Sequence, residues 1–102
     1  MPQPRIEIPK DKLAEFCQRH HIVKLSLFGS VLRDDFGPAS DIDVLVEFDP
    51  LHIPGYIRLG GIERELAKIL KGRRVDMNTP KSISRYFRDK VLSEAQAQYV
   101  RA

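Results

Sequence analysis

Hydrophobic and polar residues alternate most regularly over residues 41–48, where the sequence reads DIDVLVEF. Successive side chains of a β-strand point to opposite faces, so this alternation predicts a strand with a buried and a polar face. The buried face carries Ile42, Val44, Val46 and Phe48. Asp41 and Asp43 share the polar face, where two neighbouring carboxylates repel each other unless a cation or open water lies between them.

Two further segments have the same period of two. Residues 23–28 alternate in polarity and are predicted to form a strand that ends at a Gly29-Ser30 turn. Residues 73–78 are predicted to form a short third strand with Val75 and Met77 on one side. Asp76 falls on the opposite, polar side of this third strand.

Segments with helical spacing of apolar residues lie before and between these strands. Leu13, Phe16 and Cys17 recur at helical intervals from Asp11, and a second apolar face runs from about Tyr56 to a Gly72 stop. We expect one or two helical turns over residues 31–35 and a last helix from residues 79–80. The apolar face of that helix carries Ile83, Tyr86, Phe87 and Val91. Residues 93–102 are predicted to be helical as well.

These elements predict an α/β (α+β) fold in which a small mixed β-sheet of three or more strands is flanked by helices. Residues 1–9 contain three of the seven prolines and are expected to be an extended lead-in. Residues 10–102 are expected to form one domain with one core, which leaves no room for a separate acceptor-binding domain within these 102 residues.

Charge is unevenly distributed along the chain. Residues 23–70 hold five Lys/Arg and eight Asp/Glu, whereas residues 71–102 hold eight Lys/Arg and three Asp/Glu. Because no aromatic residues interleave with the basic ones as a base-stacking platform requires, the basic C-terminal third favours a solvated face or a protein partner over direct nucleic-acid binding.

The single cysteine, Cys17, excludes an internal disulfide and is expected to be a buried core thiol. His20 and His21 are interpreted as structural or exposed, and His52 has no evident partner in the sequence. No window approaches the roughly 20 apolar residues of a membrane span, so we expect a cytoplasmic protein.

Asp41, Asp43 and Asp76 together define a candidate metal site. Mg²⁺ prefers oxygen ligands and often bridges carboxylates to substrate phosphates. Three carboxylates on neighbouring strands could hold two such ions about 4 Å apart, the geometry that stabilises both oxygens of an in-line displacement.

The Gly29-Ser30 corner is the second half of this candidate site. A strand that runs into a Gly-Ser turn and a helix start offers backbone N–H groups to a triphosphate. Arg33 would neutralise the departing pyrophosphate, and Asp76 would help to deprotonate an attacking hydroxyl. The reaction predicted from these residues is nucleotidyl transfer, in which positioning and charge neutralisation do most of the work.

Each of these residues also has a purely structural interpretation. An arbitrary Asp-x-Asp is often an exposed strand start, Ser30 can be a helix cap, Gly29 can serve an unusual backbone dihedral, and Arg33 can pair with Asp34 or Asp35. The combination of the corner with three carboxylates favours the functional interpretation of those residues, whereas the two interpretations of Arg33 stay equally open.

The order of these motifs resembles the polymerase-beta-type nucleotidyltransferase superfamily, and more narrowly its minimal nucleotidyltransferases. The resemblance rests on Gly29-Ser30, Arg33, the run from Ser40 through Asp41 and Asp43 to Phe48, and the segment 72–76 that ends in Asp76. It extends over nearly the whole chain from Leu13, although many relatives have Gly where this chain has Asp34.

The resemblance implies catalytic and metal-binding roles for Asp41, Asp43 and Asp76, and nucleotide binding by Gly29, Ser30, Arg33 and Ser40. It also implies ATP as substrate, Mg²⁺ as cofactor, and a toxin–antitoxin partnership with a HEPN ribonuclease that is silenced by transfer of AMP to a tyrosine. Two alternatives remain: an antitoxin that acts by binding alone, and a nucleotidyltransferase for a small-molecule acceptor, which the missing acceptor domain disfavours.

Overall fold

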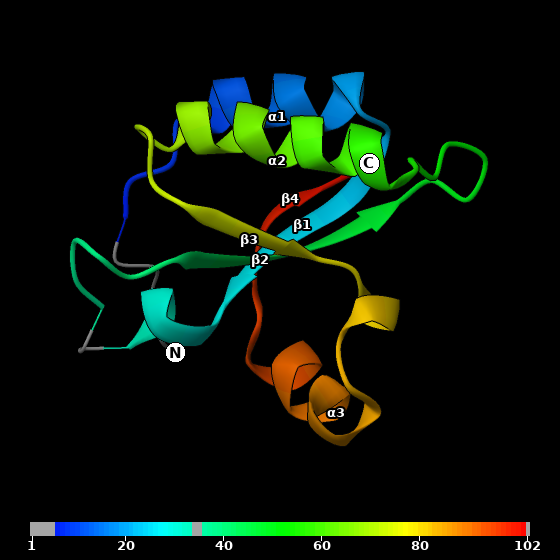
Figure 1. The fold of residues 1–102 in the computed structure, drawn as a ribbon. Coiled ribbons are helices and arrows are strands. Elements are labelled where there is room, and N and C mark those ends of the chain that lie inside the picture. The colour runs from blue at the N-terminus through cyan, green and yellow to red at the C-terminus, as the bar shows by residue number, and fades with distance from the viewer. Residues whose placement is uncertain (1–5, 34–35, 102) are drawn as a thin grey trace.

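The computed structural model describes residues 6–33 and 36–101 (Figure 1). Along the chain, helices and strands alternate with two short 3₁₀ helices: α1 (Lys10–Arg19), β1 (Ile22–Phe28), η1 (Gly29–Leu32), β2 (Ile42–Phe48), α2 (Tyr56–Ile69), β3 (Val75–Asn78), η2 (Pro80–Ser82), α3 (Arg85–Glu94) and β4 (Gln96–Val100).

The strands form one sheet in the order β3-β2-β1-β4. β1 pairs antiparallel with both β2 and β4, whereas β2 and β3 are parallel. A parallel pair needs a long crossover connection, and α2 supplies it here. This mixed sheet with flanking helices confirms the predicted fold class.

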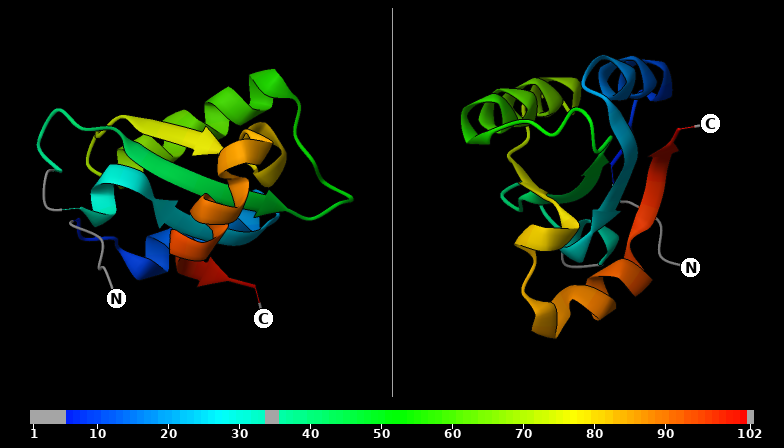
Figure 2. Two further views of the ribbon diagram at one scale, coloured as in Figure 1. Left: turned by 90° about the horizontal axis from the view of Figure 1, so that it is seen from below. Right: turned by 90° about the vertical axis from the view of Figure 1, so that its right-hand side faces the viewer.

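The core lies between the sheet and the two helices that cover one of its faces (Figures 1 and 2). Ile42, Val44 and Val46 are fully buried on that face of β2, as the alternation predicted. They pack with apolar residues of β1 and of both helices, among them Leu13, Phe16, Cys17, Leu25, Leu27, Ile62 and Leu66. Each of these buried aliphatic side chains contributes about 1.5–3 kcal/mol, so this packing sets which way every β2 side chain faces.

Cys17 is buried in this core, as predicted. Burial raises the pKa of its thiol to about 12. Within the described ranges, no helix is both long enough and apolar enough to cross a membrane.

The prediction of a helix over residues 93–102 was wrong. α3 ends at Glu94, and Gln96–Val100 forms strand β4 along the free edge of β1, with Ala102 outside the described residues. The sequence offers no strong helical face there, and pairing with β1 satisfies backbone groups that a frayed helix would leave to water.

Two other helices differ from their predictions. The short helix expected over residues 31–35 is a 3₁₀ helix that begins earlier, at Gly29, and residues 34–35 lie outside the described part. The last helix is divided, because η2 ends at Ser82 and α3 begins only at Arg85, capped by the Ser84 side chain. Tyr86 and Phe87, assigned by spacing to a helix face, are exposed rather than buried.

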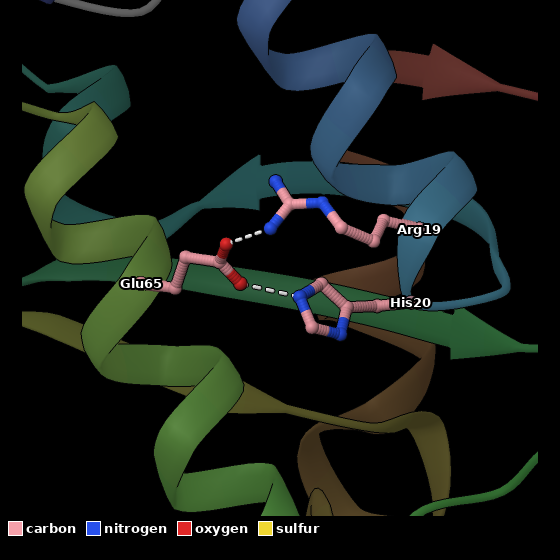
Figure 3. A network of polar contacts seen from close by, with 3 residues as sticks. All are labelled: Arg19, His20 and Glu65. Atoms are coloured by element: carbon pink, nitrogen blue, oxygen red, sulfur yellow. Dashed lines mark hydrogen bonds and ion pairs between the residues drawn. The ribbon is translucent and has the colours of Figure 1, made fainter.

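A polar network joins α1 to α2 next to the core (Figure 3). Glu65 of α2 accepts from Arg19 and contacts the Nε2 atom of His20. Burial alone would raise the pKa of Glu65, but the hydrogen bonds from His20 and Arg19 outweigh it and lower the pKa. His21 and His52, expected to be exposed or unpartnered, stack with ring centroids 3.7 Å apart.

We predict that Glu65→Gln lowers the free energy of unfolding by about 1 kcal/mol at pH 7, a value discounted for the partial exposure of the carboxylate. Because the folded-state pKa is lowered, the contribution of Glu65 is present above its unfolded pKa and is lost as the pH falls through the folded pKa.

Urea unfolding of both proteins over a pH series, from pH 7 down to the lowest pH at which both still fold, measures this difference. Glu15→Gln, at an exposed position of α1, is the control and is expected to change stability by less than about 0.5 kcal/mol. A destabilisation by Glu65→Gln that does not shrink toward the acid end of the series would contradict the assigned network.

Candidate functional site

Asp43 and Asp76 lie side by side on neighbouring strands. The parallel pairing of β2 with β3 aligns Asp43 with Asp76, one position after Ile42 with Val75. Ile42 is buried and Val75 nearly so, which places both carboxylates on the face of the sheet opposite the core. The structure therefore brings together two of the three predicted carboxylates through the sheet register itself.

The Gly29-Ser30 corner packs directly against Asp43. Phe28, the last residue of β1, is the register partner of Asp43, and the chain turns at Gly29 with φ +76°. A Cβ at position 29 would overlap the Asp43 carboxylate and lie 3.2 Å from its Cγ. Only glycine combines this left-handed backbone with this close approach.

Burial and neighbouring carboxylates raise the pKa of Asp43. Desolvation is the largest cause, and the charges of Asp76 and then Asp41 add to it. A backbone hydrogen bond from Ser30 and the charge of Arg33 act in the opposite direction. Burial and the neighbouring carboxylates therefore outweigh the groups that favour the charged form of Asp43.

Asp41 lies just before β2 and is held differently. Arg74 forms an ion pair with it, with a Nε to Oδ1 distance of 3.0 Å, and the Ser30 hydroxyl donates to the Asp41 backbone oxygen at 3.3 Å. Asp41 and Asp76 also line a cavity of about 390 Å³ between α2 and the β3 edge, together with Glu63, Arg64, Ala67, Arg74 and Val75.

Ser40 and Arg33 occupy less central positions. The Ser40 Oγ accepts from the Gly37 backbone N–H at 3.1 Å, and Arg73 donates to the Ser40 backbone oxygen at 3.0 Å, so Ser40 braces the turn before β2. Arg33 is exposed next to η1, and its charge reaches Asp43. The pairing of Arg33 with Asp34 or Asp35 lies outside the described residues.

Glu63, Arg64 and Arg74 were not among the predicted site residues. Burial, and then the charge of Asp76, raises the pKa of Glu63. Arg74 could have been found, because it lies two residues before Asp76 on the same strand face. Glu63 and Arg64 could not have been found from the sequence, because only the crossover geometry of α2 brings them to the β3 edge.

The donor set suits a hard divalent cation. Carboxylate oxygens are the ligands Mg²⁺ prefers, and the crowding at Asp43 is the kind of charge excess that such an ion relieves. Among the described residues, no three His, Cys, Asp or Glu side chains are already gathered around one point. The Oδ1 atom of Asp41 is paired with the exposed Arg74.

Comparison with known proteins assigns the family. A family model described as "Nucleotidyltransferase domain" matches residues 10–98. The chain belongs to the nucleotidyltransferase domain family. Two relatives in Methanocaldococcus jannaschii are each named "Putative protein adenylyltransferase". One is 35% identical over 86 residues, 84% of this chain and 89% of the relative. The other is 36% identical over 76 residues, 74% of this chain and 75% of the relative.

Solved structures share the fold. A "putative minimal nucleotidyltransferase" is 30% identical with a TM-score of 0.69, covering 84% of this chain and 85% of that one, which confirms the predicted resemblance. A "toxin-antitoxin with AMP-PNP" has a TM-score of 0.72 at 20% identity, over 91% of this chain and 74% of that one. The "toxin-antitoxin MntA-HepT" has a TM-score of 0.64 at 19% identity, over 89% and 69% of the two chains.

We predict that Gly29→Ala destabilises the protein more than Gly72→Ala does. Both glycines have positive φ, +76° and +80°, but a Cβ at position 72 would meet nothing within 4 Å, whereas one at position 29 overlaps Asp43. Gly72→Ala is expected to cost about 1 kcal/mol from backbone strain alone, and Gly29→Ala about 2–3 kcal/mol.

Denaturant unfolding of the two variants measures the difference, and Gly55→Ala, where φ is negative and the space is open, is the control for substitution itself. Equal destabilisation by Gly29→Ala and Gly72→Ala would show that the corner does not press on Asp43.

Proposed function

We propose that this chain is an Mg²⁺-dependent protein adenylyltransferase that transfers AMP from ATP to a tyrosine of a partner HEPN ribonuclease toxin and so acts as its antitoxin. The observation that carries the proposal is the alignment of Asp43 with Asp76 on adjacent strands, with the Gly29-Ser30 corner packed against Asp43.

In this proposal the residues have separate tasks. Asp41 and Asp43 hold Mg²⁺ with Asp76 completing the set, and Gly29, Ser30 and Ser40 form the nucleotide-binding side. The ion, when bound, neutralises phosphate charge and polarises the α-phosphate. The tyrosine oxygen attacks the α-phosphorus, Asp76 takes the phenolic proton, and pyrophosphate leaves toward Arg33.

The comparisons support the acceptor class and the nucleotide. The Methanocaldococcus relatives, at 35% and 36% identity, are named as adenylyltransferases of proteins. A structure of the same fold was solved with AMP-PNP, an ATP analogue, and several are toxin–antitoxin complexes. The HEPN identity of the partner is our inference from the resemblance of this chain to minimal nucleotidyltransferases.

One observation favours the alternative that the chain neutralises a toxin by binding alone. Asp41 is paired with Arg74, and no ready-made cluster of three ligating side chains is found in residues 6–33 and 36–101. The two functions make opposite predictions for Asp43→Asn: it abolishes neutralisation of the toxin if the chain acts as an enzyme and leaves neutralisation intact if the chain acts by binding.

We predict that the wild-type chain, incubated with Mg²⁺, α-labelled ATP and the protein encoded by the neighbouring gene, labels that protein, and that this neighbour belongs to the HEPN family. Asp43→Asn is expected to reduce labelling by at least about 100-fold, because it removes a carboxylate that would hold Mg²⁺, and Mg²⁺ would neutralise the charge of the transferred phosphate. Radiolabel on the partner measures transfer, and mass spectrometry locates the modified tyrosine.

Asp11→Asn is the matched control, since Asp11 is an exposed carboxylate in the first turn of α1, and it is expected to leave labelling unchanged. Absence of labelling with every nucleotide, together with toxin neutralisation by Asp43→Asn, would refute catalysis and support the binding antitoxin.

A further inference from the structure

Arg74 is an exposed arginine beside the carboxylates of the candidate site. Its Nε atom lies 3.0 Å from the Oδ1 atom of Asp41, and the Arg74 and Asp41 side chains are 80% and 51% exposed. An ion pair between side chains this exposed is screened by water and contributes little to stability. Loss of the Arg74 charge is therefore expected to leave the fold intact.

The sheet register places Arg74 opposite Asp41, next to the two aligned carboxylates. β2 and β3 are parallel with Asp43 opposite Asp76, and the Ile42 backbone N–H donates to the Arg74 backbone oxygen at 2.9 Å. Asp41 and Arg74 each lie two residues before this aligned pair, which is one full period of a strand. Two rows of charged side chains follow each other along the strands, the first of opposite charges and the second of like charges.

Asp41 links Arg74 to the predicted phosphate corner. The Ser30 hydroxyl donates to the Asp41 backbone oxygen at 3.3 Å, while the Asp41 side chain pairs with Arg74. Asp41, Arg74 and Asp76 also line the same cavity of about 390 Å³. The Arg74 charge is thus adjacent both to the proposed metal ligands and to the place proposed for the phosphates.

Arg73, the preceding residue, is bound in a different way. It donates to two backbone oxygens of the turn before β2, at 2.8 and 3.0 Å, and its guanidinium lies over the Phe36 ring, 4.5 Å from the centroid. Within residues 6–33 and 36–101, the charged partner of Arg74 is Asp41. Arg73 therefore has a structural role, whereas the exposed guanidinium of Arg74 is accessible to a ligand.

A positive charge at this point acts in opposite directions on the two forms in which a metal ion can arrive. Arg74 lies well within a Debye length of any ion that Asp41 binds, so it repels a free divalent cation. The complex of that cation with a nucleoside triphosphate is net negative, and its phosphates are attracted by a guanidinium.

We infer that Arg74 makes the candidate site selective for a divalent cation in complex with a nucleoside triphosphate, and disfavours the free cation. This inference rests on the proposed function for the identity of the nucleotide. Arg74 is not a metal ligand, because a guanidinium has no acceptor to offer. Its role also differs from that of Arg33, whose charge acts on Asp43.

Binding of Mn²⁺ with and without nucleotide tests this inference on the full chain. Electron paramagnetic resonance measures binding of Mn²⁺ alone, and isothermal titration calorimetry measures binding of the equimolar Mn²⁺ complex of AMP-PNP. Arg74→Gln is expected to bind Mn²⁺ alone about three- to tenfold more tightly and the complex about three- to tenfold more weakly, because the two ligands have opposite charge. Both changes should shrink at high salt.

Three further variants serve as controls. Arg74→Lys keeps the charge and is expected to have nearly the wild-type affinity for both ligands. Arg64→Gln makes the same substitution at another arginine of the cavity, one whose charge acts on Glu63, and is expected to change either affinity by less than about twofold. Asp43→Asn is expected to abolish binding of both ligands, which locates the binding at this site.

Circular dichroism checks that each variant is folded. If Arg74→Gln does not fold, Arg74→Met replaces it with the same expectations, because it also removes the charge and keeps a long side chain.

The inference is overturned if removal of the charge shifts the two affinities in the same direction or leaves both unchanged. It is also overturned if Arg74→Lys behaves like Arg74→Gln, or if neither the wild type nor the charge-removing variant binds Mn²⁺ alone or its AMP-PNP complex. AMP transfer separates this result from the proposed function. Opposite shifts without transfer to any partner support the role of Arg74 and refute the enzyme, whereas transfer by a wild type whose Arg74 variants bind normally does the reverse.

Discussion

The register between β2 and β3 is the constraint on which the site depends. Burial of Ile42, Val44 and Val46 against the helices fixes which way every side chain of β2 points, and so turns Asp43 to the opposite face. A slip of one residue would move the aspartate into the core and the aliphatic side chains into water. The free energy of apolar packing therefore holds Asp43 beside Asp76, against the repulsion between the two carboxylates.

The corner at Gly29 places backbone donors next to this pair of carboxylates, an arrangement that suits the nucleotide substrate we propose. The chain leaves β1 next to Asp43 and turns so closely that only a residue without a Cβ fits. The Ser30 backbone N–H and the Arg33 charge both act on Asp43, so donors and carboxylates meet within a few residues. This juxtaposition of positive and negative groups is the arrangement that nucleotide phosphates with a divalent cation would complete.

The strand β2 and the face that carries Asp43 could be predicted from the sequence. The reason is that β2 has a clear period of two, and burial of its apolar residues outweighs the other local preferences of the chain. Asp76 could be placed on a polar face by the same reasoning, although the partner of β3 could not. The C-terminal segment was assigned wrongly because Gln96–Val100 becomes a strand only through the free edge of β1, a tertiary effect that local pattern does not contain. Tyr86 and Phe87 have helical spacing, but spacing cannot tell whether an apolar helix face is buried in the core or exposed.

The pairing of Asp41 with Arg74 and the position of Glu63 were also beyond the sequence. The first depends on the pairing of β3 with β2, and the second on how α2 crosses to the β3 edge. Both features concern the central claim, which is that the carboxylates at the start of β2 and on β3 form one site for a cation and a nucleotide. Paramagnetic broadening of backbone amide resonances by Mn²⁺ in the presence of ATP tests this claim most directly. Broadening is expected at residues 29–30, 41–43 and 76, and little at the distant His21 and His52. Broadening that is absent, or that centres on other carboxylates such as Asp49 and Glu65, would contradict it.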